Sequence, residues 1–247
     1  MSSLDDRAYL VTGAAAGIGA AVTAALRAAG ARVLAVDLEE GGDGDSVGAD
    51  LTVADENARV VEEARRRFGR LDGVVANAGV QHVAPVAEFP VEQWDRILAL
   101  MLTSPFLLAR AAWPALVESP AGRFVAIASV HGVVASPFKS AYVSAKHGVV
   151  GLVKTLALEG AEDGISATAV CPGYVRTGLV EGQIASQAEA TGVDESKVLD
   201  EVILEPHAVK RLIEPEEVAG VVRFLMSDEG AAFTGTPVVM DQGWTAR

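Results

Sequence analysis

The stretch AYLVTGAAAGIGAAVTAALRAAGARVLAVD, residues 8–37, decides the fold of this chain. Its pattern predicts a strand over AYLVT (8–12), a helix over AGIGAAVTAALRAAG (16–30) and a second strand over ARVLAVD (31–37). The glycine-rich TGAAAGIG (12–19) lies between the first strand and the helix. A strand, a crossover helix and a second strand predict the start of a parallel sheet.

The same alternation continues along the chain. Further strands are predicted over 44–51, 71–79, 123–129, 165–173 and 236–244, and helices over 56–69, 94–117, 140–164 and 215–230. This order predicts a single α/β domain, residues 1–247, with a doubly wound (Rossmann) parallel sheet of about seven strands and helices on both faces. Residues 174–211 break the pattern with turn formers and weak helical stretches, and we expect them to form a helical substrate lid.

Composition narrows the class of protein. A chain of 247 residues that is 50% hydrophobic fits one domain with a full core. Its formal net charge of −13 argues against nucleic acid or an anionic membrane as a partner. The single cysteine, Cys171, excludes an internal disulfide and agrees with a reducing compartment. The opening MSSLDDRAYL is not expected to be a secretory signal, and Arg110, Lys154 or glycines interrupt the later apolar stretches. We expect a soluble, cytoplasmic protein without a metal site.

The glycine-rich loop predicts a dinucleotide site. Gly13 permits a tight turn, and Gly17 and Gly19 allow the backbone and the helix to approach closely. The N-terminus of the helix offers unpaired N–H groups to a pyrophosphate. A glycine pattern alone also describes an ordinary turn, but its place between a strand and a helix favours the nucleotide.

Asp37, at the end of the second strand, predicts which dinucleotide binds. A carboxylate there accepts hydrogen bonds from the adenosine ribose and repels a 2′-phosphate. No Arg or Lys occurs in the stretch 14–16 or at Leu38 to receive that phosphate. NAD is therefore favoured over NADP, although Asp37 could also be a polar residue that starts a turn.

Other residues at strand ends extend this site. Asp50 could accept a hydrogen bond from the adenine amino group, and Gly79 lets the backbone approach a ribose. Each could equally be turn chemistry. The residues expected to contact NAD are Gly13, Ala15, Gly17, Ile18, Gly19, Asp37, Leu38, Asp50, Leu51, Asn77, Ala78, Gly79, Tyr142, Lys146, Pro172, Gly173, Val175 and Thr177.

The stretch SVHGVVASPFKSAYVSAK, residues 129–146, carries the candidate catalytic groups. Tyr142 and Lys146 are four positions apart, on one face of a predicted helix. A cation about 4 Å from a phenol contributes roughly 4 kcal/mol at an effective dielectric of ~20, which would lower the pKa of tyrosine by up to about three pH units. Tyr142 could then act as a general acid and base, with Ser129 bonded to a substrate oxygen. A tyrosine and a lysine at this spacing are also common in helices without catalytic function.

TGAAAGIG, NAG, Ser129 with YVSAK, and CPG, in this order, resemble the short-chain dehydrogenase/reductase family over almost the whole chain. The resemblance implies hydride transfer between a nicotinamide and a carbinol or carbonyl carbon, with Tyr142 as the acid and base. It further implies that Lys146 holds the nicotinamide ribose and lowers the pKa of Tyr142, and that Ser129 orients the substrate oxygen.

NAGVQHVAP, SVHG, the lysine of PFKSAY, and LVEGQI resemble more narrowly the D-3-hydroxybutyrate dehydrogenases, cytosolic enzymes that interconvert (R)-3-hydroxybutyrate and acetoacetate with NAD. This resemblance implies that Gln81, His131, Lys139 and Gln183 bind the substrate carboxylate, to which one cation and several donors are suited. Each could instead be an ordinary polar surface or loop residue. The residues expected to contact substrate are Gln81, Ser129, His131, Lys139, Tyr142, Tyr174, Gln183 and Trp244.

Three positions depart from these patterns. Met101 stands where the family has an asparagine that supports a water beside the lysine, and a thioether cannot donate a hydrogen bond. Either the main-chain carbonyl alone holds that water or proton exchange is impaired, and we expect Met101→Asn to raise turnover. Tyr174 replaces the tryptophan of CPGW, and Gln242 replaces a glycine of DGGW. Trp244 is retained, either as a wall of the pocket or as core packing.

Several functions remain open at this point. The substrate could be another small alcohol, a polyol or a branched hydroxy acid, and Met101 leaves room for an NAD-binding protein of weak activity. A 3-oxoacyl-carrier-protein reductase is opposed by Asp37 and by the lack of a basic patch. Residues 92–117 and 141–160 are too apolar for a monomer surface, and the resemblance implies that they pair subunits into a homotetramer.

Overall fold

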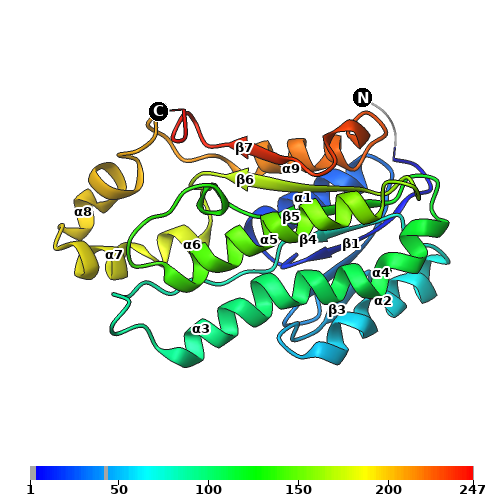
Figure 1. Ribbon diagram of the computed structural model, residues 1–247, viewed down its shortest axis with the longest axis horizontal. Helices are drawn as coiled ribbons and strands as arrows, with labels where there is room; N and C mark the ends of the chain where they lie inside the picture. Colours follow the sequence, from blue (N-terminus) through cyan, green and yellow to red (C-terminus); the bar gives the residue numbers. More distant parts are fainter. Residues whose placement is uncertain (1–3, 42–43, 247) are drawn as a thin grey trace.

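The computed structural model describes residues 4–41 and 44–246, and within them one seven-stranded parallel sheet forms the centre of the fold (Figure 1). Part of the opening segment, residues 1–3, lies outside the described residues. The strand order is β3-β2-β1-β4-β5-β6-β7. The strands are β1 (Ala8–Thr12), β2 (Arg32–Asp37), β3 (Ser46–Gly48), β4 (Gly73–Ala76), β5 (Arg123–Ile127), β6 (Ser166–Pro172) and β7 (Pro237–Met240). The predicted single-domain, doubly wound sheet is confirmed.

Helices cover both faces of the sheet (Figure 1). On one face α1 (Gly17–Ala28) packs against α9 (Pro215–Leu225) over a core that includes Val22 and Leu26. On the other face lie α2 (Ala54–Phe68), α4 (Ser104–Glu118) and α5 (Ser140–Glu159). The order reverses between β1 and β4, so the ligand crevice of a doubly wound sheet is expected at the carboxyl ends of these strands.

The helix predicted over 94–117 is interrupted. The chain forms α3 (Val91–Leu98), a π-helical turn η1 (Ala99–Thr103) and then α4. Pro105 has no N–H, so the carbonyl of Met101 lacks its α-helical donor, and the N–H of Ser104 bonds instead to the carbonyl of Ala99, five residues back. The missing N–H of Pro105, which hydrophobic periodicity does not reveal, therefore explains why the predicted helix is interrupted.

The expectation that charged residues or glycines interrupt every apolar stretch before a membrane-spanning length is wrong for one segment. Residues Val91–Glu118 have a mean hydropathy of 1.4 over an apolar window and are long enough to cross a membrane by length and composition. In this fold they pack as a layer on the sheet, where Ile97, Leu108 and Leu116 are buried and α4 contacts α2. Core helices of globular proteins can be equally long and equally apolar.

The segment 174–211 holds short helices beside the carboxyl edge of the sheet (Figure 1). They are α6 (Gly178–Glu181), α7 (Ile184–Thr191), α8 (Glu195–Val198) and the π-helical η3 (Leu199–Ile203). Val198, Ile203 and Leu212 form a small core that includes Tyr174. Two 3₁₀ turns, η2 (Val130–Gly132) and η4 (Ala231–Phe233), were not predicted from the sequence.

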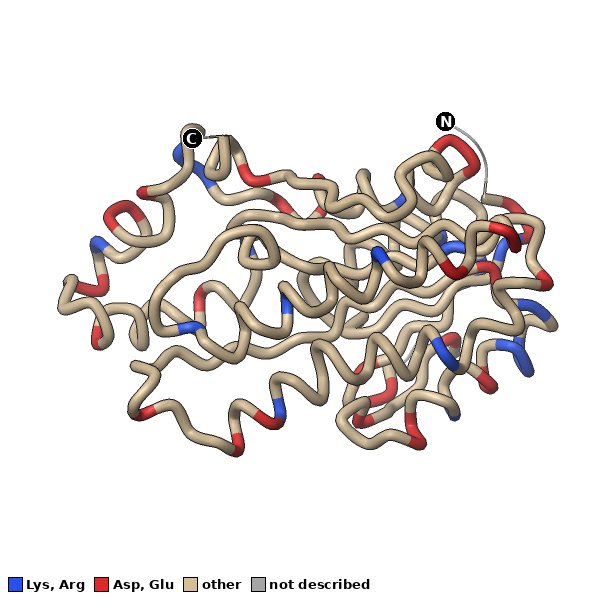
Figure 2. The backbone as a smooth tube through the Cα atoms, viewed as in Figure 1, with Lys and Arg blue, Asp and Glu red and all other residues tan. Residues whose placement is uncertain are grey.

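Most charged residues lie around the sheet, and within it only β2 and β5 carry any, including the buried Arg123 of β5. Strands β1, β3, β4, β6 and β7 carry none, and Figure 2 shows acidic and basic positions spread over the helices and loops. Three arginines of α2 pair with acids of the same helix, Arg59 with Glu56 and both Arg66 and Arg67 with Glu63, while Arg65 pairs with Glu118 at the end of α4. This helix therefore does not present an unbalanced basic face.

Candidate active site

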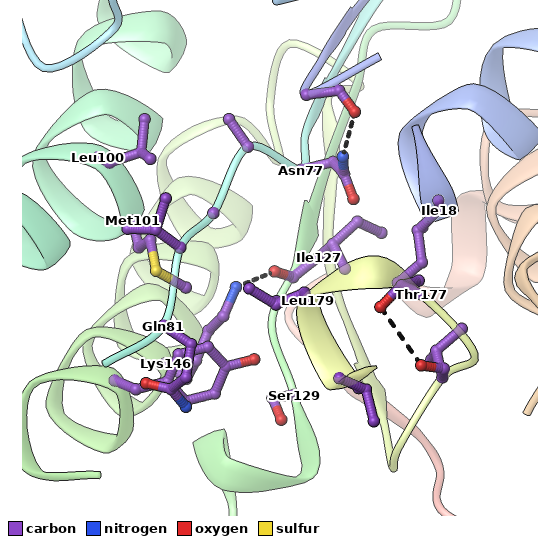
Figure 3. Close-up of a pocket in the computed structure, with 18 of the residues that line it drawn as sticks. Ile18, Asn77, Gln81, Leu100, Met101, Ile127, Ser129, Lys146, Thr177 and Leu179 are labelled. Carbon is purple, nitrogen blue, oxygen red and sulfur yellow. Dashed lines mark hydrogen bonds between the residues drawn. The ribbon is translucent and has the colours of Figure 1, made fainter. Parts of the chain in front are cut away.

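A cavity of about 360 Å³ opens at the carboxyl ends of the strands. All of the predicted site residues line it except Ala15, Gly19 and Trp244. The topology alone explains this gathering, because parallel strands end at one edge and the loops that follow them meet there. Figure 3 shows Gln81, Met101 and Lys146 together at one side of the cavity, and Ile18 and Thr177 at another.

The glycine loop is held close to β4 and α1. Gly13 has a φ of +64°, a conformation that favours glycine. The side chain of Asn77 donates to the carbonyls of Thr12 at 2.8 Å and Gly13 at 3.1 Å. A Cβ atom on Gly19 would lie 1.9 Å from the carbonyl oxygen of Gly13. Gly19 therefore permits close packing of the helix without reaching the cavity, and Asn77 fixes the loop.

Asp37 ends β2 with its carboxylate at the cavity wall. One of its oxygens accepts the N–H of Ala15 at 2.9 Å, and the other accepts the N–H of Leu38 at 2.8 Å. Ala15 therefore orients Asp37 and does not line the cavity itself. The carboxylate is fixed by the backbone while keeping lone pairs for further donors.

Asp50 and Arg96 lie further along the same wall. The Asp50 carboxylate accepts the N–H and the hydroxyl of Thr52, which lowers the pKa of Asp50. The nearby charge of Arg96 lowers it further. Arg96 was not predicted from the sequence, although it lies one turn before Leu100 on the helix that carries Met101.

Tyr142, Lys146 and Ser129 converge in the cavity as predicted, but the expected electrostatic effect is wrong. The Lys146 ammonium donates to the carbonyl of Ile127 at 2.5 Å and lies 5.6 Å from the centroid of the Tyr142 ring. Burial raises the pKa of Tyr142, against which its hydrogen bond to Ser129 acts. Burial also lowers the pKa of Lys146 to about 8. Desolvation therefore decides the direction of the pKa of Tyr142, and the charge of Lys146 does not offset it.

Lys139 is a buried cation, only 2% exposed, at the start of α5. Phe138 immediately before it has a φ of +67°, a strained conformation for a bulky residue, which turns the chain at this point. The Lys139 ammonium donates to the hydroxyl of Tyr174 at 2.7 Å. No carboxylate among the residues that the structure describes forms an ion pair with Lys139. Burial lowers its pKa to about 8.

His131 is neutral in this site. Burial and the charge of Lys139 lower its pKa to about 3. One ring nitrogen lies 2.9 Å from the hydroxyl of Ser136 and the other 3.4 Å from the hydroxyl of Ser129. A serine therefore faces each nitrogen, and the imidazole supplies no positive charge to a ligand.

The two glutamines differ in how free their amides are. The oxygen of Gln81 accepts the N–H of His82 at 3.0 Å, so its NH₂ group is left for the cavity. The NH₂ group of Gln183 donates to the carbonyl of Leu179 at 2.7 Å, while its oxygen is buried without a hydrogen-bond partner. Gln183 therefore has one N–H remaining for a ligand in this conformation.

Trp244 lies behind the cavity wall rather than on it. Its ring stacks on that of Tyr174, with centroids 5.7 Å apart and an interplanar angle of 14°. It also contacts His207 edge-on at 5.1 Å. The nearby Gln242 has a φ of +55°, the left-handed region that favours the glycine of the resembled pattern. Trp244 supports Tyr174 through packing.

Several lining residues were not predicted as contacts. They are Ala16, Ala49, Thr52, Val80, Arg96, Leu100, Met101, Ile127, Ala128, Val130, Gly178, Leu179 and Val180. Met101, noted in the sequence only as a departure, is buried, and its methyl group would lie 3.2 Å from a Cβ atom on Gly79 (Figure 3). Arg96 lies five residues before Met101, a separation that α-helical spacing does not place on one face, and apolar positions such as Ala128 leave no signal in a sequence.

Comparisons with known proteins agree with this geometry. The profile of the family described as "Enoyl-(Acyl carrier protein) reductase" matches residues 13–245. The D-beta-hydroxybutyrate dehydrogenase of Rhizobium meliloti (strain 1021) is 45% identical, over 96% of this chain and 98% of that protein. The enzyme of the same name from Cupriavidus necator is 38% identical over 99% and 100%. The ligand-free aldohexose dehydrogenase of Thermoplasma acidophilum superposes with a TM-score of 0.90, at 29% identity, over 100% of this chain and 96% of that one.

Proposed function

We propose, because the chain belongs to the short-chain dehydrogenase/reductase family, that this oxidoreductase interconverts (R)-3-hydroxybutyrate, or a similar short 3-hydroxy acid, and acetoacetate with NAD. The observation that carries the proposal is Lys139, a buried ammonium in the same cavity as Tyr142. A buried charge is costly unless it is paired, and none of the described carboxylates pairs with Lys139. An anionic group on the substrate would supply the partner.

The residues present fit NAD. A Cβ atom on Gly17 would lie 2.9 Å from the Thr177 side chain, so the missing side chain lets the glycine loop lie close to Thr177 at the cavity wall. Asp37 can accept from ribose hydroxyls, and residues 13–18 and 37–38 contain no basic side chain for a 2′-phosphate. When bound, the nicotinamide supplies the hydride acceptor or donor.

Side chains of this protein would then transfer the proton and orient the substrate. In reduction the Tyr142 phenol donates its proton to the carbonyl oxygen as the hydride reaches carbon 3. In oxidation Tyr142 must first lose its proton, and the phenolate then takes the proton of the substrate hydroxyl as the hydride leaves carbon 3. Ser129, hydrogen-bonded to Tyr142, orients that oxygen. Lys139 holds the carboxylate, with the free amide hydrogens of Gln81 and Gln183 as further donors.

A substrate screen tests this function. NADH formation is to be measured with (R)- and (S)-3-hydroxybutyrate, longer 3-hydroxy acids and neutral polyols. We expect the highest kcat/KM with the (R) isomer of a short acid. A preference for polyols would assign the chain to another branch of the family, and NAD binding without turnover of any hydroxy acid would indicate a protein of weak catalytic activity.

Replacing Asp37 is expected to change the cofactor preference. Asp37→Asn keeps the shape but removes the negative charge that favours a ribose hydroxyl and repels a 2′-phosphate. Because hydrogen bonds to charged groups contribute about 1.5–3 kcal/mol, the KM for NAD should rise roughly tenfold or more, and the relative activity with NADP should increase. Steady-state kinetics with both cofactors provide the measurement. Asp55→Asn, at an exposed site in the first turn of α2, is the control.

The pH dependence of carboxylate binding should follow Lys139. Its pKa of about 8 means that the ammonium is present below pH 8 and is lost above it. Lys146, with a pKa also of about 8, affects every substrate, so the ratio of kcat/KM for acetoacetate to that for methyl acetoacetate isolates Lys139. This ratio should fall above about pH 8. An inflection between pH 5 and 7 would instead indicate a protonated His131, contrary to its pKa of about 3.

We also propose a homotetramer, supported by apolar side chains on the outer helices. Phe106 and Val117 of α4 and Leu158 of α5 are exposed, Leu158 by 81%. Gel filtration should give about four times the chain mass of 25.5 kDa. Elution at the mass of one chain would contradict this arrangement.

A further inference from the structure

Tyr174 and Lys139 form a buried pair at the substrate end of the cavity. The Lys139 ammonium donates to the Tyr174 hydroxyl at 2.7 Å and lies 4.9 Å from the centroid of its ring. Both side chains are at least nine-tenths buried, and both line the cavity. The pair brings a cation and a phenol to one place.

The Tyr174 ring is held from two sides. Trp244 stacks on it at 5.7 Å, and the edge of His131 meets it at 6.2 Å. These contacts fix the position of the hydroxyl. Burial raises the pKa of Tyr174, so the phenol keeps its hydrogen at any working pH.

The hydrogen of this hydroxyl is available for a ligand. Because the oxygen already accepts from Lys139, the O–H must donate elsewhere, and none of the hydrogen bonds among the described residues uses it as a donor. A tryptophan at this position could not do the same, because an indole N–H only donates and cannot accept from a lysine.

We propose that Tyr174 is a specificity-determining residue that binds the substrate carboxylate together with Lys139. The ammonium bonds to one carboxylate oxygen and the phenol O–H to the other. The inference rests on the proposed function and adds to it a recognition element specific to this chain. Tyr174 also holds Lys139 in place before substrate arrives, which reduces the entropy lost when the lysine is immobilised on binding.

The test compares a charged substrate with an uncharged one in Tyr174→Phe, which keeps the stacked ring and removes only the hydroxyl. In the reduction direction with NADH, the KM for acetoacetate should rise roughly tenfold or more. The KM for methyl acetoacetate should change by less than about twofold, since the ester offers no anion. Tyr9→Phe is the matched control, because Tyr9 is another buried tyrosine whose hydroxyl donates to the carbonyl of Met226, outside the cavity.

A pH profile separates this role from simple packing. The phenol oxygen stabilises the Lys139 ammonium by accepting its hydrogen bond, so Tyr174→Phe should move the fall in the acetoacetate-to-ester ratio to lower pH. His131, Tyr142 and His207 are the other titratable groups beside the pair, and all three remain unchanged in the variant. If Tyr174 contributed only packing, the pH at which this ratio falls would be the same in the variant and the wild type.

The outcomes distinguish this inference from the proposed function. If the wild-type enzyme does not favour acetoacetate over its ester, the proposed function fails. If it does favour acetoacetate and Lys139→Met removes the preference, but Tyr174→Phe behaves as wild type, only the role of Tyr174 is overturned. An equal rise in both KM values for Tyr174→Phe would also overturn it. Thermal unfolding and NADH binding of each variant confirm that the comparison concerns folded protein.

Discussion

Tyr142→Phe is expected to lower kcat for acetoacetate reduction by about 10²–10⁴-fold, the usual contribution of a positioned general acid. The phenol faces the cavity beside Ser129, and its raised pKa keeps it protonated at neutral pH, ready to donate to a carbonyl oxygen. Phenylalanine fills the same space without a proton. Steady-state rates at saturating acetoacetate and NADH give the measurement.

The matched control is again Tyr9→Phe, which should retain wild-type turnover. NADH binding by fluorescence should persist in Tyr142→Phe, so that the loss is assigned to chemistry rather than to folding. A kcat within tenfold of wild type would show that another group supplies the proton, and Tyr142 would then be only part of the cavity wall.

Lys139→Met is expected to lose affinity for the acid and to gain stability. Removing one partner of a buried charge pair costs about 2–5 kcal/mol, so the KM for acetoacetate should rise roughly 100-fold. The pKa of Lys139, lowered from 10.5 to about 8, shows that the fold disfavours the ammonium. An apolar side chain of similar length carries no such desolvation cost, so Lys139→Met should raise the free energy of unfolding.

The stability gained by Lys139→Met should also depend on pH, in a direction that follows from the lowered pKa of Lys139. The unfolded chain holds the lysine proton up to pH 10.5, whereas the folded chain releases it near pH 8, so the cost is complete below pH 8 and disappears towards pH 10.5. The stability gained by Lys139→Met should therefore shrink over that interval in denaturant unfolding. Lys154→Met, at an exposed position of α5, should change neither KM nor stability appreciably. A Lys139 variant that keeps its affinity for acetoacetate would contradict the carboxylate role.

The regular parts of the fold were predictable because hydrophobic periodicity determines them. The first strand was predicted over 8–12 and lies at Ala8–Thr12, and the alternation of strands and helices identified the parallel sheet. The π-helical turn at Ala99–Thr103 was not predicted, since it depends on the missing N–H of Pro105 rather than on a pattern of apolar residues. The short 3₁₀ turns carry no periodicity at all.

The candidate site was predictable for residues whose role follows from their chemical type and from their position at the end of a strand. Asp37, Tyr142 and Lys146 all reach one cavity because the topology brings their elements to one edge. Burial was not predictable from spacing, and it reverses the expected direction of the pKa of Tyr142. The stacking of Trp244 on Tyr174 likewise depends on two segments far apart in the chain, which no local pattern relates.

Isotope transfer tests the central claim most directly. The protein is to be incubated with acetoacetate and NADH carrying deuterium at both C4 positions, and the product analysed by NMR and mass spectrometry. We predict (R)-3-hydroxybutyrate with one deuterium on carbon 3, derived from the nicotinamide and not from solvent. Unlabelled product, or no product at protein concentrations where NADH binding is demonstrated, would contradict the account.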